Sequence, residues 1–311
     1  MSNSEHLANV MVQSFAEAVD RGVDLVAVVA DSTSTAKIKP FAEAHPERLV
    51  NVGIAEQVMV GTAAGLALGG KVAVTCNAAP FLISRANEQV KVDICYNRTN
   101  VKLFGLNAGA SYGPLASTHH STDDISVMRG FGNIEIFAPS CPVECKQIVE
   151  YAIAKEGPVY IRLDGKALPE LHDAAYQFKP GQVDVLAEGK QVAIVALGSA
   201  VHEAVDAASL LSSEGISAKV INLSSIRPLE RQALAAALAG MKSVVSVEEH
   251  NINGGAGAIT AEVMAEHGVE AKLVRLGIKD GEYAIAGDRP STRADLGIDV
   301  QGIVSAVKAL L

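Results

Sequence analysis

The feature that most constrains the fold of this chain is a regular alternation of strand-length apolar runs with longer amphipathic runs. In the first half, the expected strands cover residues 24–31, 71–76, 100–106, 133–139 and 158–163, and the expected helices cover 56–70, 81–96, 123–131 and 141–157. Continuous apolar strands are typical of parallel sheets covered on both faces, and each parallel pair needs a crossover, usually a helix. The alternation therefore predicts an α/β protein with doubly wound, mainly parallel sheets.

The alternation lapses over residues 166–187, where two prolines and mixed charges interrupt it. A second cycle follows, with strands expected at 191–198, 218–223, 243–249 and 271–276, and helices at 199–215, 230–240, 256–268 and at the C-terminal end to Leu311. Segments rich in proline and mixed charge commonly connect domains. We expect a first domain of residues 1–165, a linker of residues 166–187 and a second domain of residues 188–311.

Composition excludes several classes of protein. A length of 311 residues suits two domains that each bury a core. Lys and Arg number 26 against 35 Asp and Glu, a formal net charge of −9, which argues against the basic footprint of a nucleic-acid-binding protein. The N-terminal sequence lacks a signal-peptide pattern, and no apolar run reaches the roughly 18 residues of a membrane helix. We expect a soluble, cytoplasmic protein that binds neither nucleic acid nor membrane.

The four cysteines are too few for a disulfide framework in a chain of this length. Cys141 and Cys145 stand at helical spacing, but no second pair of Cys or His lies near them in the sequence. Buried structural thiols are therefore favoured over a zinc site.

Glu56 stands where an expected loop opens into the helix of residues 56–70, which is otherwise almost entirely apolar. Free backbone N–H groups in a first helical turn stabilise a carboxylate, so Glu56 can simply complement the helix dipole. The apolar flanks favour a second interpretation, a buried carboxyl group that faces a ligand. The residues alone leave both interpretations open.

The loop of residues 107–124 is polar, contains glycines and follows an expected strand. Ligands of open α/β sheets bind at the carboxyl edge of the strands. His119 and His120 are therefore candidates for contact with a ligand, although adjacent histidines do not easily face one metal ion. Part of the polarity has a local explanation, because Ser121 or Thr122 can cap the following helix.

The segment of residues 248–263 follows an expected strand, contains three glycines and opens a helix. It matches half of a dinucleotide-binding fingerprint, but Thr260 replaces the third glycine and no acidic residue follows at the ribose position. Glycines for a tight turn and close helix packing are the better explanation.

Five segments together resemble the C-terminal half of transketolases, in the arrangement where the enzyme is split into two polypeptides. They read NVGIAEQVMVGTAAGLA, PFLISRANEQV, THHSTDDI, VINLSSIRPLE and VEEHNINGGAGAITAEV. They are also similar, less closely, to deoxyxylulose-phosphate synthases and to the β subunits of 2-oxo-acid dehydrogenases. The resemblance covers nearly the whole chain in the correct order. It implies a pyrimidine-binding domain followed by a transketolase C-terminal domain.

The resemblance also implies cofactors and a partner. Thiamine enzymes of this kind hold the cofactor diphosphate through Mg²⁺ with a GDG motif and a later Asn, and this sequence contains no GDG. Thiamine diphosphate and Mg²⁺ are the implied cofactors, with no metal ligand in this chain and the metal site in an N-terminal partner subunit. An α2β2 heterotetramer follows from the same resemblance.

Four residues acquire cofactor roles from the resemblance. Glu56 matches the glutamate that hydrogen-bonds the pyrimidine N1′ atom and favours the imino tautomer, which makes it the catalytic candidate. Burial among apolar side chains would keep that carboxyl group able to share a proton. Phe81 is expected to line the pyrimidine pocket, Ile54 to touch the cofactor and Asp31 to lie near the same pocket.

The positions that bind sugar phosphate in ordinary transketolases are altered. Ala8 and Gly165 stand at arginine positions, Leu115 at an aspartate position, Asn87 at a tyrosine position and Asn107 at a histidine position. Losing two arginines removes bidentate phosphate recognition. The resemblance therefore implies a changed substrate, such as a different ketose, a sulfo- or deoxy-sugar, or an α-keto acid.

Four residues remain as substrate-binding candidates: Thr35, Asn107, His119 and Lys166, the last as a point charge in place of an arginine. We expect the C-terminal subunit of a transketolase-like transferase of carbohydrate metabolism, which moves a two-carbon ketol or acyl unit between small carbonyl or sugar substrates. The alternatives are the β subunit of a 2-oxo-acid decarboxylating dehydrogenase, or a catalytically degenerate partner subunit. A free-standing dinucleotide-binding protein is the least favoured interpretation.

Overall fold

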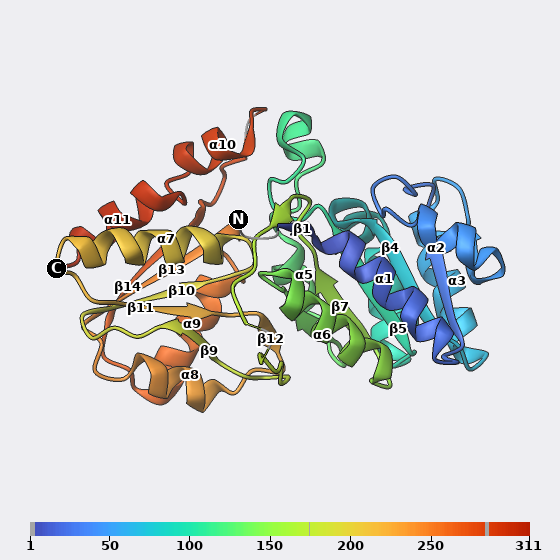
Figure 1. Ribbon diagram of the computed structural model, residues 1–311, viewed down its shortest axis with the longest axis horizontal. Coiled ribbons are helices and arrows are strands. Elements are labelled where there is room, and N and C mark those ends of the chain that lie inside the picture. Colours follow the sequence, from blue (N-terminus) through green and yellow to red (C-terminus); the bar gives the residue numbers. More distant parts are fainter. Residues whose placement is uncertain (1–3, 174, 284–285) are drawn as a thin grey trace.

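The computed structural model describes residues 4–173, 175–283 and 286–311. Two lobes lie side by side, and each contains a twisted sheet between layers of helices (Figure 1). The expected α/β class with doubly wound, mainly parallel sheets is confirmed. Within the described residues, no helix is long and apolar enough to cross a membrane.

The sheet of the first lobe runs in the order β12-β6-β7-β5-β4-β2-β3. Its parallel strands are β2 (Leu25–Val29), β3 (Leu49–Asn51), β4 (Val72–Ala78), β5 (Val101–Leu106), β6 (Glu135–Phe137) and β7 (Val159–Arg162). These are the apolar runs that the sequence marks as strands, together with the short strand β3. Because the strands are parallel, their carboxyl ends share one edge of the sheet.

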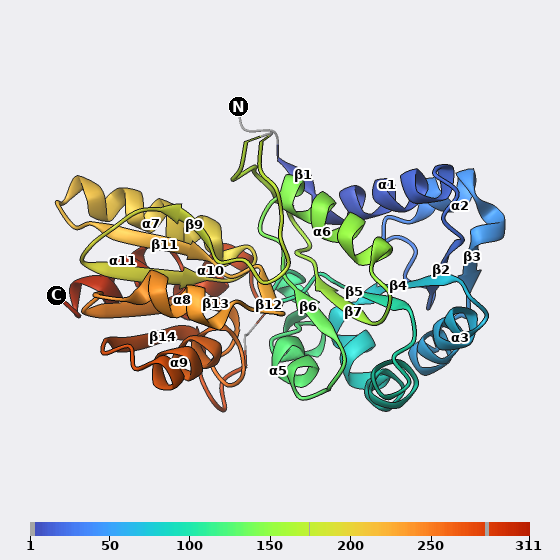
Figure 2. The ribbon, with the colours of Figure 1, turned by 90° about the horizontal axis from the view of Figure 1, so that it is seen from below.

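Helices cover both faces of this sheet (Figure 2). One layer comprises α1 (Leu7–Asp20), α2 (Lys39–Ala44) and α6 (Pro142–Ala154), and the other comprises α3 (Glu56–Leu68), α4 (Asn87–Gln89) and α5 (Asp124–Arg129). Helix α1 was not among the expected helices, although its apolar residues recur at helical spacing at Leu7, Val10 and Met11. The single helix expected over residues 81–96 is instead α4 between two π-helical turns, η2 (Phe81–Arg85) and η3 (Val90–Tyr96).

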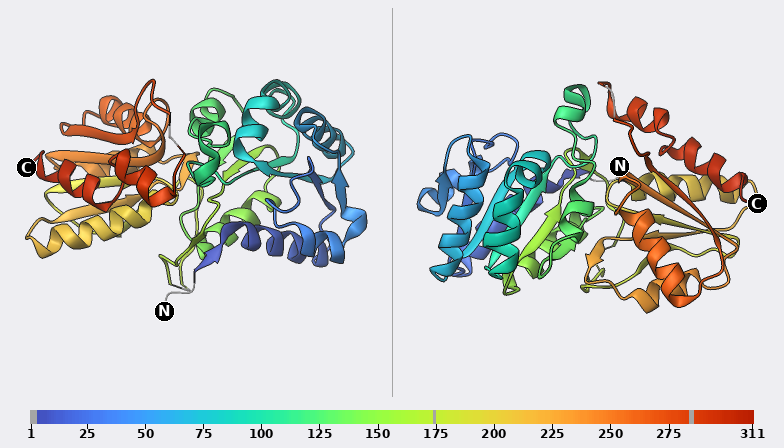
Figure 3. Two further views of the ribbon diagram at one scale, coloured as in Figure 1. Left: turned by 90° about the horizontal axis from the view of Figure 1, so that it is seen from above. Right: turned by 180° about the vertical axis from the view of Figure 1, so that it is seen from behind.

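The sheet of the second lobe runs in the order β14-β13-β10-β11-β9. Its strands are β9 (Asp184–Ala187), β10 (Val192–Ala196), β11 (Ala218–Asn222), β13 (Ser243–Asn251) and β14 (Lys272–Ile278). Helices α7 (Ala200–Ser213) and α11 (Val300–Lys308) pack on one face, and α8 (Arg231–Leu238) and α9 (Ala256–His267) on the other. The C-terminus lies at the outer end of this lobe (Figure 3).

The two lobes share a strand and part of their core at the junction. Strand β12 (Ser225–Arg227), from the second half of the chain, adds to the first sheet antiparallel to β6. Strand β9 lies inside the interval expected as a linker, and it pairs antiparallel with β11 of the second sheet. One cluster of buried apolar residues runs from the first lobe into the second. The junction is therefore a shared core, which local sequence patterns do not reveal.

The remaining elements lie around the edges of the lobes. They are β1 (Glu5–His6), β8 (Ala167–Leu168), η1 (Pro46–Arg48), η4 (Gly113–Thr118) and α10 (Arg289–Asp295). Strands β1 and β8 pair antiparallel, which brings the start of the described chain beside the segment that follows β7. The segment with η4 lies close to α10, since a Cβ at Gly113 would stand 3.1 Å from the Gly287 carbonyl oxygen.

Candidate active site

Glu56 is the first residue of α3, at the carboxyl edge of the first sheet, and only 5% of it is exposed. Arg85 Nη1 donates to its Oε1 at 3.1 Å, and Asn77 Nδ2 donates to the same oxygen at 3.3 Å. Burial of Glu56 agrees with the sequence-based prediction. The two polar partners were not expected, because they come from the end of β4 and from η2, and nothing in the local pattern joins them to Glu56.

Aromatic and cationic groups continue outward from this carboxylate. The Arg85 guanidinium lies over the Phe81 ring, 4.3 Å from its centroid, in cation–π contact. The His119 ring meets Phe81 edge-on at 5.3 Å and Tyr112 at 5.5 Å, measured between ring centroids. The structure thus brings together three residues that the sequence singled out separately, Glu56, Phe81 and His119. The π-helical pitch of η2 places Phe81 and Arg85 beside each other, and such turns are frequent at functional sites.

The two adjacent histidines have different environments. His119 is half-buried, and its Nδ1 lies 2.9 Å from Thr118 Oγ1. His120 is buried, with its Nε2 3.2 Å from the Gly113 carbonyl oxygen, and burial lowers its pKa. His120 therefore holds the loop, whereas His119 belongs to the candidate site.

Asp31 lies just beyond the end of β2 with a φ of 59°, and its backbone N–H donates to Asn51 Oδ1. The same oxygen accepts from Gly53 N, so Asn51 ties the turn after β2 to the turn that leads into α3. Ile54 in that second turn is 76% exposed. Thr35 is half-buried in the turn after β2, and in the described part of the chain no hydrogen bond or ring contact joins it to Glu56.

Asn107 and Gly165 lie next to each other at the carboxyl edge of the first sheet. Asn107 follows β5 with a φ of 52°, and a Cβ at Gly165 would stand 2.4 Å from its Oδ1. Gly165 follows β7, and its N–H donates to Ser111 Oγ at 3.3 Å. A side chain at position 165 would require the Asn107 side chain to move, so the two departures from the ordinary transketolase pattern are in contact.

Lys166 is exposed and belongs to a group of basic side chains that the sequence did not connect. Burial, followed by the positive charges of Lys37 and Lys166, lowers the pKa of His6. The pairing of β1 with β8 sets His6 opposite Ala167, next to Lys166 in the chain. Two lysines and a histidine, from the N-terminal strand, the turn after β2 and the segment after β7, therefore lie near one another.

The second lobe supports the loop of residues 107–124 through buried charges. Glu249, 2% exposed, accepts from the Ala110 N–H at 2.6 Å, from Arg289 Nε at 2.9 Å and from Arg293 Nε at 2.6 Å. Arg289 also forms a bidentate ion pair with Asp164, which follows β7. Helix α10 thus connects both lobes to the loop that carries His119.

The glycine-rich segment after β13 binds a carboxylate of the chain itself. Glu248 accepts from the backbone N–H groups of Ala256 at 2.6 Å and Gly257 at 2.9 Å, at the start of α9. A Cβ at Gly255 would stand 1.8 Å from Glu248 Oε2. Close packing therefore explains the glycines, and Glu248 occupies the place where a dinucleotide fold would receive a phosphate.

The ionisation of Glu248 should make the free energy of unfolding depend on pH. Burial raises its pKa to about 7, against the opposing hydrogen bonds from the start of α9. Because an acid with a raised folded-state pKa holds its proton longer in the folded chain, stability should fall between about pH 4.5 and pH 7, by at most about 1.4 kcal/mol per pH unit. Glu248→Gln should lack this decline in denaturant titrations, whereas Glu262→Gln on the exposed side of α9 should keep it. Parallel curves for the wild type and Glu248→Gln would contradict the assignment.

Comparisons with known proteins agree with this geometry. Residues 6–170 match the family model of the transketolase pyrimidine binding domain, and residues 181–303 match that of the transketolase C-terminal domain. The chain belongs to the transketolase family. The family model of the pyrimidine binding domain spans Glu56, Phe81, Arg85 and His119.

Three relatives are similar over nearly the whole chain. A subunit of the apulose-4-phosphate transketolase of Actinobacillus succinogenes is 68% identical over 310 residues, and the alignment covers 100% of each chain. The equally named subunit from Phocaeicola vulgatus is 36% identical, with 90% of this chain and 89% of that protein covered. A solved structure described as a split gene transketolase, inactive beta4 tetramer, superimposes with a TM-score of 0.89 at 34% identity, covering 99% of each chain.

Proposed function

We propose that this chain is the C-terminal subunit of a cytoplasmic, two-chain transketolase that uses thiamine diphosphate to transfer a two-carbon ketol unit from apulose 4-phosphate. The observation that carries the proposal is the Glu56, Arg85 and Phe81 cluster, in a chain that matches one subunit of an apulose-4-phosphate transketolase over its full length. Both catalysis and cofactor binding would require the N-terminal partner subunit.

The residues of this chain fit the pyrimidine half of thiamine diphosphate. Thiamine diphosphate, when bound, supplies a nucleophilic carbon and an electron sink. A buried carboxyl group beside an aromatic ring suits a pyrimidine, because Glu56 can share a proton with a ring nitrogen while Phe81 covers the ring. Arg85 and Asn77 fix the rotamer of Glu56, and His119 stands beyond Phe81, where it can hydrogen-bond a substrate hydroxyl or carbonyl group. The Mg²⁺ ligands are expected from the partner.

The basic group formed by His6, Lys37 and Lys166 supports a phosphorylated donor. Ammonium groups bind phosphate as point charges, without the planar fork of arginine. Lys166 follows Gly165 and His6 lies two residues before Ala8, and Gly165 and Ala8 are the two positions that correspond to arginines in ordinary transketolases. A changed arrangement of cations suits a sugar phosphate whose phosphate lies differently from that of a pentose 5-phosphate.

The exposed face of α3 supports binding of the partner at this edge. Every residue of α3 after Gln57 is apolar, glycine or threonine, although half of the helix faces outward. Exposed large apolar side chains continue from α3 onto η3, which packs against it: Ile54, Val58, Leu68, Val92 and Tyr96. An apolar surface that extends from the turn before Glu56 is typical of a subunit interface. The α2β2 stoichiometry is part of this proposal.

Val58→Glu is expected to weaken association with the N-terminal subunit about tenfold or more, equivalent to about 1.4 kcal/mol. Val58 is 55% exposed, so a carboxylate there is tolerated in the free chain but would be desolvated in the interface. The dissociation constant can be measured by analytical ultracentrifugation. Tyr283→Glu, at a 79% exposed position of the second lobe, is the matched control and should bind normally. Equal affinities for the two variants would place the interface elsewhere.

The decisive experiment combines the chain with its cognate N-terminal subunit, thiamine diphosphate and Mg²⁺, and measures transfer from apulose 4-phosphate to an aldose phosphate. Each chain alone should be inactive. Pyruvate-dependent reduction of an artificial electron acceptor would instead identify a 2-oxo-acid dehydrogenase subunit. A complex that gives no heat with thiamine diphosphate in calorimetry would identify a degenerate partner, and heat with NAD would identify a dinucleotide-binding protein.

A further inference from the structure

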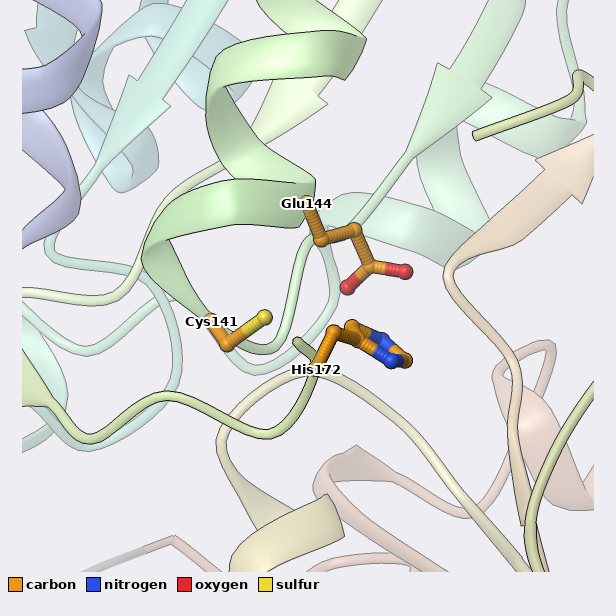
Figure 4. Close-up of side chains that lie close together, drawn as sticks. All are labelled: Cys141, Glu144 and His172. Atoms are coloured by element: carbon orange, nitrogen blue, oxygen red, sulfur yellow. The ribbon is translucent and has the colours of Figure 1, made fainter. Parts of the chain in front are cut away.

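Three side chains with metal-ligating atoms meet where the lobes join, away from Glu56. Cys141 precedes the first turn of α6, Glu144 lies within that turn, and His172 belongs to the segment between β8 and β9. Figure 4 shows the three side chains pointing toward one another. Their potential ligand atoms all lie within 4.8 Å of one another. Within the described residues, this is the one group of three His, Cys, Asp or Glu side chains with such spacing.

The surroundings are negatively charged and buried. Glu144 is fully buried, Asp184 Oδ2 lies 3.2 Å from His172 Nε2, and Glu170 accepts from Val143 N at the start of α6. Among the described residues, no lysine or arginine forms an ion pair with any of these three carboxylates. The start of α6 contributes only about half a positive charge.

Glu144 also accepts from Ser140 N, Ser140 Oγ and Asn222 Nδ2, and burial raises its pKa. Against the effect of burial, the nearby Asp184 raises the pKa of His172. Without a metal ion, protons on these groups can offset the negative charge, and a bound cation would take their place.

The imidazole ring of His172 faces the cluster (Figure 4). Its side chain is only 8% exposed, and its buried Nε2 atom lies 3.2 Å from Asp184 Oδ2 but is not aligned for a hydrogen bond with it. The ring stacks on Tyr176 at 3.8 Å and 12°. The Tyr176 hydroxyl in turn donates to Glu144 Oε1 at 3.2 Å, so one residue orients both neighbours. Partners that orient metal-binding side chains in this way are characteristic of metal sites.

We propose that this junction is a structural zinc site, with the Cys141 sulfur, a carboxylate oxygen of Glu144 and an imidazole nitrogen of His172 as ligands. Asp184 is the nearest candidate for a fourth ligand. Thiolate with imidazole favours zinc over magnesium, which prefers oxygen, so this site is distinct from that of the cofactor metal.

Tetrahedral zinc bonds of about 2.0–2.3 Å place ligand atoms roughly 3.3–3.8 Å apart. The potential ligand atoms lie within 4.8 Å of one another, so side-chain rotations that move them by about 1 Å would bring them to that separation. Burial, followed by the charge of Glu144, raises the pKa of the Cys141 thiol, so the cation would also be what holds it as thiolate. The ligands come from the first lobe and from the interlobe segment, and Asp184 comes from the second sheet. Bound zinc would therefore hold the two lobes in their observed arrangement.

The test uses untagged full-length chain, equilibrated with zinc, passed through gel filtration and analysed for metal content by mass spectrometry. We expect about one zinc per chain in the wild type and in Cys145→Ser. Cys145 is the matched control, a fully buried thiol on the same helix whose sulfur contacts the Leu7 carbonyl oxygen instead. Cys141→Ser and His172→Gln should lose the metal. With cobalt, a sulfur-to-metal charge-transfer band should appear in the wild type and Cys145→Ser and be absent from Cys141→Ser.

Absence of stoichiometric zinc from the wild-type chain would overturn the proposal, whatever the variants do. A cobalt charge-transfer band that survives in Cys141→Ser would overturn it too. Circular dichroism establishes that each variant is folded before its metal content is compared. A rise in the wild-type melting temperature with zinc, absent from His172→Gln, would follow from preferential binding to the folded chain.

Discussion

Glu56→Gln is expected to reduce ketol transfer by the reconstituted enzyme about 10²–10⁴-fold, the range typical for loss of a positioned proton-transfer group. The amide keeps the size of the side chain but cannot share a proton with the pyrimidine. Stability should change little, because the cation left behind, Arg85, is 52% exposed and can be solvated. The turnover number of the complex at saturating thiamine diphosphate is the measurement.

Two companion variants make this result specific. Glu43→Gln replaces an exposed carboxylate on α2 of the same lobe and should leave turnover unchanged. Arg85→Met should lower turnover less than Glu56→Gln, because it removes the group that orients the carboxylate and covers Phe81 but leaves the carboxylate itself. Full activity of Glu56→Gln would remove Glu56 from the mechanism, even if the complex still bound the cofactor.

Arg289→Met is expected to destabilise the chain by about 3–5 kcal/mol, the usual cost of removing one partner from a buried charge network. Arg289 is only 9% exposed and pairs with both Asp164 and Glu249, which would be left buried with less compensation. The midpoint and slope of denaturant unfolding give the free energy. Arg231→Met, which removes exposed pairs between α8 and α9, is the control and should cost less than about 1 kcal/mol.

The pH dependence of the Arg289 effect has a definite sign. Burial alone would raise the pKa of Asp164, but Arg289 holds it well below its usual range. A depressed carboxyl pKa contributes stability above the unfolded pKa of about 3.9 and loses it as the pH falls through the folded value. In Arg289→Met, burial acts on Asp164 without that opposing charge and raises its pKa. The deficit of the variant should therefore be largest at neutral to alkaline pH and shrink progressively as the pH falls through the acid range. A deficit that is constant across the acid range would show that lost packing dominates.

The same network connects stability to the candidate site. Glu249 accepts from the Ala110 N–H, so a disturbed α10 would release the loop that carries His119. We expect Arg289→Met to raise the KM for the donor as well, at temperatures where the chain is still folded.

The sequence alone determined the class of fold and the position of the central residue. Strand and helix periodicities are local properties, set by which side chains must face a core, so the strands and most helices can be located without tertiary information. Glu56 was recognisable because an acid at the start of an apolar helix is conspicuous, and the family resemblance supplied its role. Helix α1 was missed although its helical periodicity is visible in the sequence, whereas that periodicity does not distinguish the π-helical turns of residues 81–96 from an ordinary helix.

Only the tertiary structure decided which distant residues meet. Arg85 and Glu56 are 29 residues apart, and Asp164 and Arg289 are 125 apart. The entry of β12 into the first sheet, the grouping of His6 with Lys37 and Lys166, and the meeting of Cys141, Glu144 and His172 are likewise matters of topology. Periodicity reports which face of an element is buried, but not which element lies against it. Those contacts depend on strand order and on how the lobes pack, and they decide what surrounds each charge.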